Sequence, residues 1–166
     1  MSVSAPPLSK YLEIYLNDHL MGSTVGTELV QRIAKENLGN ELGTFCSSLA
    51  QDIEADRDAL LDIMRTLDAS PDRPKVAMGW LAEKVGRLKI NGELRGYSPL
   101  SPMVELEGLA TGIEGKRQLW VALAEVEAVA ERVGADRLRT LIERADRQRE
   151  DVERHRLDAA RRAFTA

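Results

Sequence analysis

The chain has 166 residues, which is enough for one domain with a sizeable core. Hydrophobic residues make up 43% of it and charged residues 30%, a balance typical of a globular protein and not of a disordered one. The formal net charge of -4 argues against a general nucleic-acid binder, because such a protein needs a basic face to neutralise phosphates.

Cysteine content and hydropathy bear on the compartment. Cys46 is the only cysteine, so the chain cannot form an internal disulfide, which fits a reducing compartment. The start, MSVSAPPLSKYLEIYL, lacks the basic residues and long apolar run of a signal peptide. No apolar stretch approaches the roughly 20 residues that cross a bilayer. We therefore expect a cytoplasmic protein that does not bind membranes, with Cys46 as a small buried hydrophobic residue.

Two helices are predicted in the first half of the chain. One spans about residues 9–37, where apolar residues recur at steps of three and four, as on the buried face of a helix: Tyr11, Tyr15, Val25, Leu29 and Ile33. Ser9 is the expected start signal and Gly39 the expected stop. The second helix is predicted to begin near Asn40, a good cap, and to end before the prolines of DASPDRP. Because the link between them is so short, we expect an antiparallel hairpin.

A long connection, the crossover, is expected over about residues 69–100. Its first part, PKVAMGWLAEKVGRLKI, predicts a short amphipathic helix, and NGELRGYSPLSP predicts a loop. A tight hairpin turn at Asn91-Gly92 is the alternative. Trp80 is expected to seal one side of the molecule, with a dimer contact as its alternative role.

The second half predicts another hairpin. Ser101 and Pro102 suit the start of a third long helix, which we expect to continue to Gly134. Asp136 is the expected cap of a fourth helix that runs to the C-terminal region. The whole chain, residues 1–166, is thus predicted to be one all-α domain of two antiparallel hairpins. A crossover of this length permits the second and third helices to run parallel.

Charged residues interrupt the apolar rows of all four predicted helices. Folding each hairpin about its central glycine brings them to similar heights, within about one turn, near the middle of the molecule. The residues in this predicted polar layer are Asp18, His19, Glu54, Arg57, Glu114, Arg117, Asp146 and Arg149.

This framework resembles the ferritin-like four-helix-bundle superfamily over nearly the whole chain. The phrases YLNDHL and LKINGELRGYSPLS are similar to actinobacterial members with a degenerate di-iron site. A di-iron member offers one glutamate from its first helix and Glu-x-x-His from its second, and the other two helices repeat this. By that resemblance, four carboxylates of this chain match the metal ligands: Asp18, Glu54, Glu114 and Asp146.

The two histidine positions of that pattern are occupied by Arg57 and Arg149. Arginine stays protonated and has no lone pair for a metal, and its charge repels a cation while it stabilises neighbouring carboxylates. We therefore expect no metal or other cofactor, and a salt-bridged layer in which Arg57, Arg117 and Arg149 neutralise the acids. Two alternatives are that these residues face water, or that the four carboxylates still bind a metal.

The sequence contains no other recognisable catalytic or ligand-binding motif. The two histidines, His19 and His155, differ in expected height, which argues against a zinc site. The glycines of GLATGIEG follow no strand, so they are not a phosphate-binding loop. We expect these glycines, with Gly22 and Gly26, to let helices approach closely.

The sequence favours a non-enzymatic bundle that acts through protein-protein association, as a homodimer. The first alternative is a di-iron or other metal-binding carboxylate protein, in iron handling or as an oxidoreductase. The second is a carrier that binds a small ligand inside the bundle.

Overall fold

The computed structural model describes residues 9–72 and 96–165. All regular structure in those ranges is helical, which confirms the all-α class for the described part of the chain: α1 (Lys10–Glu36), α2 (Glu41–Thr66), α4 (Ser101–Glu125), α5 (Glu127–Val133) and α6 (Ala135–Phe164). None of these helices is long and apolar enough to cross a bilayer. The expected crossover helix, the alternative turn at Asn91-Gly92 and Trp80 lie outside the described residues.

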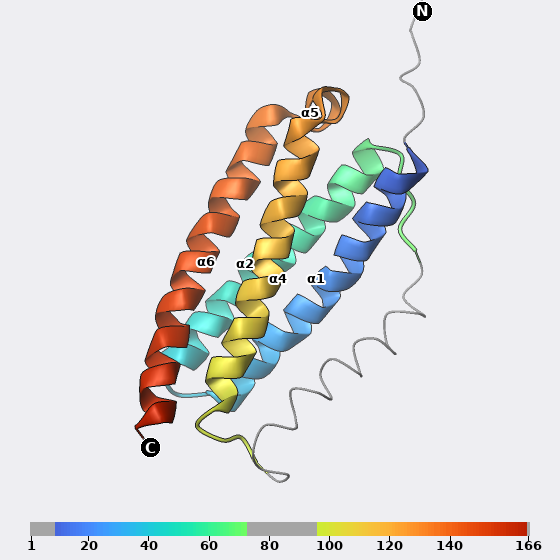
Figure 1. Ribbon diagram of the computed structural model, residues 1–166. Helices are drawn as coiled ribbons and strands as arrows, with labels where there is room; N and C mark the ends of the chain where they lie inside the picture. Colours follow the sequence, from blue (N-terminus) through green and yellow to red (C-terminus); the bar gives the residue numbers. More distant parts are fainter. Residues whose placement is uncertain (1–8, 73–95, 166) are drawn as a thin grey trace, which may run out of the picture.

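Helices α1 and α2 form an antiparallel pair with a very short link (Figure 1). The Ser9 Oγ accepts a hydrogen bond from the Tyr11 backbone N–H at 3.2 Å, so Ser9 caps α1 as its sequence predicts. Asn40 caps α2 in the same way, with its Oδ1 3.0 Å from the Gly43 N. Gly39 has a φ of +88°, a left-handed value that glycine adopts without strain.

The second pair consists of α4 and α6, with the short helix α5 between them (Figure 1). The expectation of one helix from Ser101 to Gly134 is wrong, because Val126 is extended (φ -98°, ψ 102°) and separates α4 from α5. Its carbonyl accepts the first backbone hydrogen bonds of α5, at 2.9 Å. Asp136 is not a cap, since α6 begins at Ala135, but its carboxylate lies in the first turn, where the helix dipole favours negative charge.

The two pairs are joined so that α2 and α4 run in the same direction. Figure 1 shows that the chain leaves α2 at one end of the molecule and enters α4 at the opposite end. The residues just before and just after the segment 73–95 form hydrogen bonds with the rest of the fold. Before it, Asn17 of α1 donates from its Nδ2 to the Ser70 carbonyl at 3.0 Å and accepts from the Asp72 N–H at 2.7 Å.

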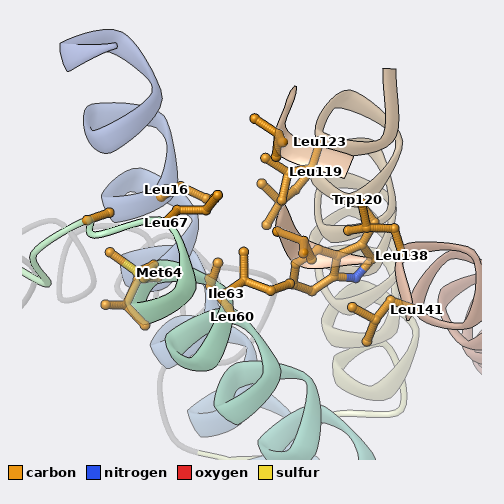
Figure 2. Close-up of a cluster of buried hydrophobic side chains, with 14 residues drawn as sticks. Leu16, Leu60, Ile63, Met64, Leu67, Leu119, Trp120, Leu123, Leu138 and Leu141 are labelled. Atoms are coloured by element: carbon orange, nitrogen blue, oxygen red, sulfur yellow. The ribbon is translucent and has the colours of Figure 1, made fainter. Parts of the chain in front are cut away.

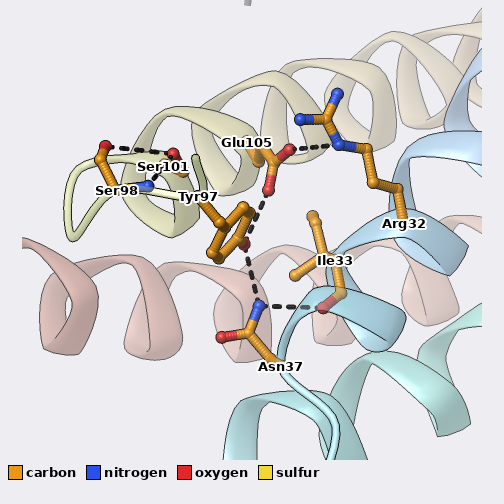
Figure 3. A network of polar contacts seen from close by, with 7 residues as sticks. All are labelled: Arg32, Ile33, Asn37, Tyr97, Ser98, Ser101 and Glu105. Atoms are coloured by element: carbon orange, nitrogen blue, oxygen red, sulfur yellow. Dashed lines mark hydrogen bonds and ion pairs between the residues drawn. The ribbon is translucent and has the colours of Figure 1, made fainter. Parts of the chain in front are cut away.

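At the other end, Tyr97 joins a buried polar network (Figure 3). Its hydroxyl donates to Glu105 Oε2 at 2.8 Å and accepts from Asn37 Nδ2 at 2.9 Å. The Nε of Arg32 lies 3.0 Å from Glu105 Oε1. Glu105 is only 3% exposed, and this burial raises its pKa, although the Tyr97 hydrogen bond and the Arg32 charge oppose the rise. The network therefore fixes the start of α4 against the end of α1.

Two apolar clusters hold the helices together. One is centred on Trp120, whose indole lies between Leu60 and Ile63 of α2 and Leu138 and Leu141 of α6 (Figure 2). Each fully buried leucine or isoleucine side chain of this cluster stabilises the fold by about 1.5–3 kcal/mol. The second cluster lies toward the α1–α2 link and includes Cys46, which is fully buried as expected. Burial raises the pKa of the Cys46 thiol to about 12, with a smaller contribution from the charge of Glu105, so the thiol stays protonated.

The link between α1 and α2 generates a first prediction, that Gly43→Ala is strongly destabilising. A Cβ at residue 43 would lie 2.1 Å from the backbone oxygen of Asn37 and 2.7 Å from its carbonyl carbon. We expect the free energy of unfolding to fall by about 3 kcal/mol, the upper range for overpacking a site that cannot give way. Chemical denaturation measures this change.

Gly22→Ala is the matched control, because a Cβ there meets nothing within 4 Å among the described residues. It should raise stability by about 0.5–1 kcal/mol, the helix-propensity gain of alanine over glycine. Equal effects of the two substitutions would contradict the tight link.

The buried carboxyl of Glu105 generates a second prediction, on pH. Because its pKa is raised in the folded state, its contribution favours folding most at low pH and is lost as the pH rises through that raised pKa. Glu105→Gln cannot ionise and therefore cannot show this loss. The unfolding free energy of Glu105→Gln minus that of the wild type should increase from pH 4.5 upward, as measured by urea denaturation. A difference that stays constant with pH up to neutrality would contradict the raised pKa.

Candidate functional site

A buried charged cluster lies where α2, α4 and α6 meet. Its centre is Asp56 of α2, which is 2% exposed. Lys116 of α4 places its Nζ 2.5 Å from Asp56 Oδ2, and Gln148 of α6 donates from its Nε2 to the same oxygen at 3.0 Å. Lys116 also donates to Gln148 Oε1 at 2.5 Å, and Arg144 of α6 forms an ion pair with Asp56 Oδ1. We call these four residues the Asp56 cluster.

The helical period explains why these polar side chains point inward. Asp56 lies three residues after Ile53 and four before Leu60, so it shares the buried face of α2 with them. Gln148 has the same relation to Ala145 and Val152 on α6. A buried carboxylate without partners costs several kcal/mol, and here both its oxygens are paired. Burial lowers the pKa of Lys116, while the negative charge and hydrogen bond of Asp56 oppose that shift.

A cavity of about 770 Å³ lies beside this cluster, bounded by α1, α2 and α4. Asp56 and Lys116 contribute to its wall, and most of the remaining wall is apolar. Five glycines also line it: Gly22 and Gly26 of α1, and Gly108, Gly112 and Gly115 of α4.

Among the described residues, only one of these glycines has the role that we expected, which is to let helices approach closely. At Gly22, Gly26, Gly112 and Gly115, an added Cβ would meet nothing within 4 Å among the described residues. Only at Gly108 does another helix approach, with Leu29 Cδ2 at 3.5 Å. Among the residues that the structure describes, the other four border the cavity and do not contact a neighbouring helix.

Four of the eight predicted layer residues come together, all from the second hairpin. Arg117 Nε lies 2.6 Å from Asp146 Oδ1, and Arg149 Nη1 lies 2.9 Å from Glu114 Oε2 and 3.5 Å from Asp146 Oδ1. These four side chains are 32–44% exposed, so they form a partly solvated patch between α4 and α6. Ion pairs with this exposure contribute up to about 1 kcal/mol each.

The four predicted residues of the first hairpin are placed differently. Glu54 is exposed and accepts a hydrogen bond from Gln31 at 2.8 Å, away from the other predicted acids. Asp18, His19 and Arg57 line the cavity. His19 also packs edge-on against Tyr15, with ring centroids 4.6 Å apart, and its burial lowers its pKa against the opposing effect of Asp18.

Sequence reasoning missed all four members of the Asp56 cluster. The signal was present, because Asp56 and Gln148 lie on apolar rows in the same way as the residues that we selected. Neighbouring residues on a helix point about 100° apart, so placing Arg57 at the centre of the buried face displaced Asp56 from it. On α4, Lys116 and Arg117 are also adjacent, so the sequence did not show which of the two belongs to the buried face.

The described residues do not fit a di-iron centre. No group of three or more histidine, cysteine, aspartate or glutamate side chains in the described ranges is arranged to hold a metal ion. The buried acid, Asp56, is paired with two cations, Lys116 and Arg144, which would repel a metal. The acids Glu114 and Asp146 are likewise paired with arginines.

Comparisons of the chain with models of protein families, with curated proteins and with solved structures found no match. The interpretation of the site therefore rests on its own geometry.

A third prediction compares two cations that differ in burial. Lys116→Met removes a partner of a buried carboxylate, and we expect the free energy of unfolding to fall by roughly 3 kcal/mol. Arg149→Met removes a cation that is 44% exposed and should cost less than about 1 kcal/mol. Urea denaturation of both variants at neutral pH measures the difference. If Arg149→Met lowered the free energy of unfolding more than Lys116→Met, the main buried polar layer would be the one predicted from the sequence, which includes Arg149.

Proposed function

We propose that this protein is a small-ligand carrier that binds a mainly apolar molecule in the cavity between α1, α2 and α4. The observation that carries the proposal is the cavity itself, whose wall is mostly apolar and also includes charged residues of α1, α2 and α4. Its volume of about 770 Å³ lies within the range of about 300–1,000 Å³ for small-molecule sites. The polar groups include Asp56 and Lys116, whose positions are fixed by their mutual ion pair.

The glycines in the wall give independent support. Each glycine inside a helix costs about 0.5–1 kcal/mol relative to alanine. At Gly22, Gly26, Gly112 and Gly115, no described neighbour requires the absence of a side chain. Alanine would therefore stabilise the helices, whereas glycine keeps the space between them open. A binding function accounts for that cost, which packing among the described residues does not explain.

For the fold we propose a ferritin-like four-helix bundle. Two antiparallel pairs, with α2 and α4 running in the same direction, support this assignment (Figure 1). Within such a bundle, the Asp56 cluster takes the central place that carboxylates and histidines have in di-iron members. The metal-binding alternative has less support, since lysine and arginine are the partners of the buried acid. The homodimer and other protein partners that the sequence favours stay predictions.

A fourth prediction tests ligand binding with an uncharged fluorescent probe. N-phenyl-1-naphthylamine should bind the wild type, with energy transfer from Trp120, which lines the cavity. A Trp80→Phe background leaves Trp120 as the only tryptophan. In that background, Gly112→Leu should weaken probe binding without loss of stability, because its side chain would fill part of the open space.

The control for this experiment is Ala122→Leu, which adds the same side chain to an exposed position of α4. It should leave probe binding unchanged. Absence of probe binding to the parent protein, or equal binding by the Gly112→Leu variant, would contradict the proposed function.

A further inference from the structure

We infer that the ligand enters and leaves the cavity sideways, through an opening between α1 and α4 whose edges include Gly22 of α1 and Thr111 of α4. The small residues at these edges control access to the cavity. This inference rests on the proposed function and concerns how the same cavity exchanges its ligand.

Two contacts fix the heights of α1 and α4 relative to each other. The Nε of Arg32 lies 3.0 Å from Glu105 Oε1, and Leu29 Cδ2 would lie 3.5 Å from a Cβ added at Gly108. Between these contacts the chain goes back by three residues on α1 and forward by three on α4. The two helices therefore run antiparallel in a constant register.

The same register places glycines of the two helices opposite each other. Gly22 lies seven residues before Leu29, and Gly115 lies seven residues after Gly108, which is about 10 Å along each helix. Both Gly22 and Gly115 line the cavity, and an added Cβ at either would meet nothing within 4 Å among the described residues. Space therefore remains between α1 and α4 at this height.

The cavity reaches the surface along this stretch. Gly22, Gly108, Thr111 and Gly112 all line the cavity, and all four are exposed. Ile113, the next residue of α4, also lines the cavity but is buried. A space that is bordered by exposed and by buried residues of one helix extends from the outside of the molecule to its interior. Because the exposed residues are glycine and threonine, a ligand that passes between them meets little steric obstruction.

Described residues border the cavity on its other sides. At one end, Leu16 of α1 belongs to the same buried apolar cluster as Trp120 of α4. At the other end, Leu29 of α1 approaches the backbone of α4. Helix α1 packs closely against α2, and the buried ion pair of Asp56 with Lys116 joins α2 to α4. The stretch between α1 and α4 is therefore the route that the described part of the chain leaves open.

The experiment attaches a bulky polar group at the edge of this opening. Gly22→Cys, in the Trp80→Phe background, is converted to its mixed disulfide with glutathione, which stays in water because it is charged. The native Cys46 is fully buried and should not react. Mass spectrometry checks that each chain carries one glutathione. Stopped-flow fluorescence then measures the association and dissociation rate constants of N-phenyl-1-naphthylamine before and after modification.

We expect modification to lower both rate constants by about tenfold, because the attached group obstructs entry and exit alike. Their ratio, the Kd, should change by less than about twofold. Reduction of the disulfide should restore both rate constants.

Two further variants locate the opening. Thr111→Cys lies on its opposite edge and should respond to modification in the same way; the Thr111 hydroxyl donates to the Glu107 carbonyl of its own helix, at 2.9 Å. Ala122→Cys is the control, because Ala122 is an exposed residue of α4 that does not line the cavity. Its modification should change neither rate constant.

The outcomes separate the two proposals. If the probe does not bind the parent protein, the carrier function fails and the inference fails with it. If the probe binds, but modification at residues 22 and 111 leaves both rate constants unchanged, the ligand uses another route and only the inference fails. A rise in Kd caused by faster dissociation would also overturn the inference, because it would show a disturbed binding site and not an obstructed route.

Discussion

The ion pair between Asp56 and Lys116 is the constraint on which the arrangement of the two hairpins depends. Asp56 belongs to the first hairpin, while Lys116, Arg144 and Gln148 belong to the second. Because a buried carboxylate without these partners would be costly, the hairpins must meet in one register. The backbone of α2 nevertheless stays well separated from those of α4 and α6 over most of its length. Long polar side chains bridge that separation.

The cavity follows from the same separation. On the opposite side of the cluster, α1 and α4 approach near Leu29 and Gly108 and are joined again by Arg32 and Glu105. Between these contacts and the Trp120 cluster, glycines replace the side chains that would otherwise fill the space. The molecule therefore combines two well-packed ends with an open middle whose wall is mostly apolar and carries charged residues of α1, α2 and α4. That combination suits a binding site better than a structural role alone.

Much of the fold could be predicted from the sequence, because its signals are local. Caps at Ser9 and Asn40 and short links between apolar periodic segments specify the hairpins. The break at Val126 carries no such signal, since neither glycine nor proline lies there.

The site was harder to predict, because its geometry depends on helix rotation. Asp56 and Arg57 are adjacent in sequence, and only the packing of α2 against its neighbours decides which of them is buried. The role of the glycines was also ambiguous, because a glycine in a helix can either allow a neighbouring helix to approach closely or leave a space open. The expected carboxylate and arginine residues of the second hairpin do meet, but at a partly exposed position.

The most direct test of this account is a double-mutant cycle between Asp56 and Lys116. The free energy of unfolding is measured for the wild type, Asp56→Asn, Lys116→Met and the double variant. A buried pair that fixes the register of the hairpins should give a coupling energy of about 2 kcal/mol or more, within the range for contacting residues in one network. A coupling energy below about 0.5 kcal/mol, as for exposed pairs, would contradict the central role of this interaction.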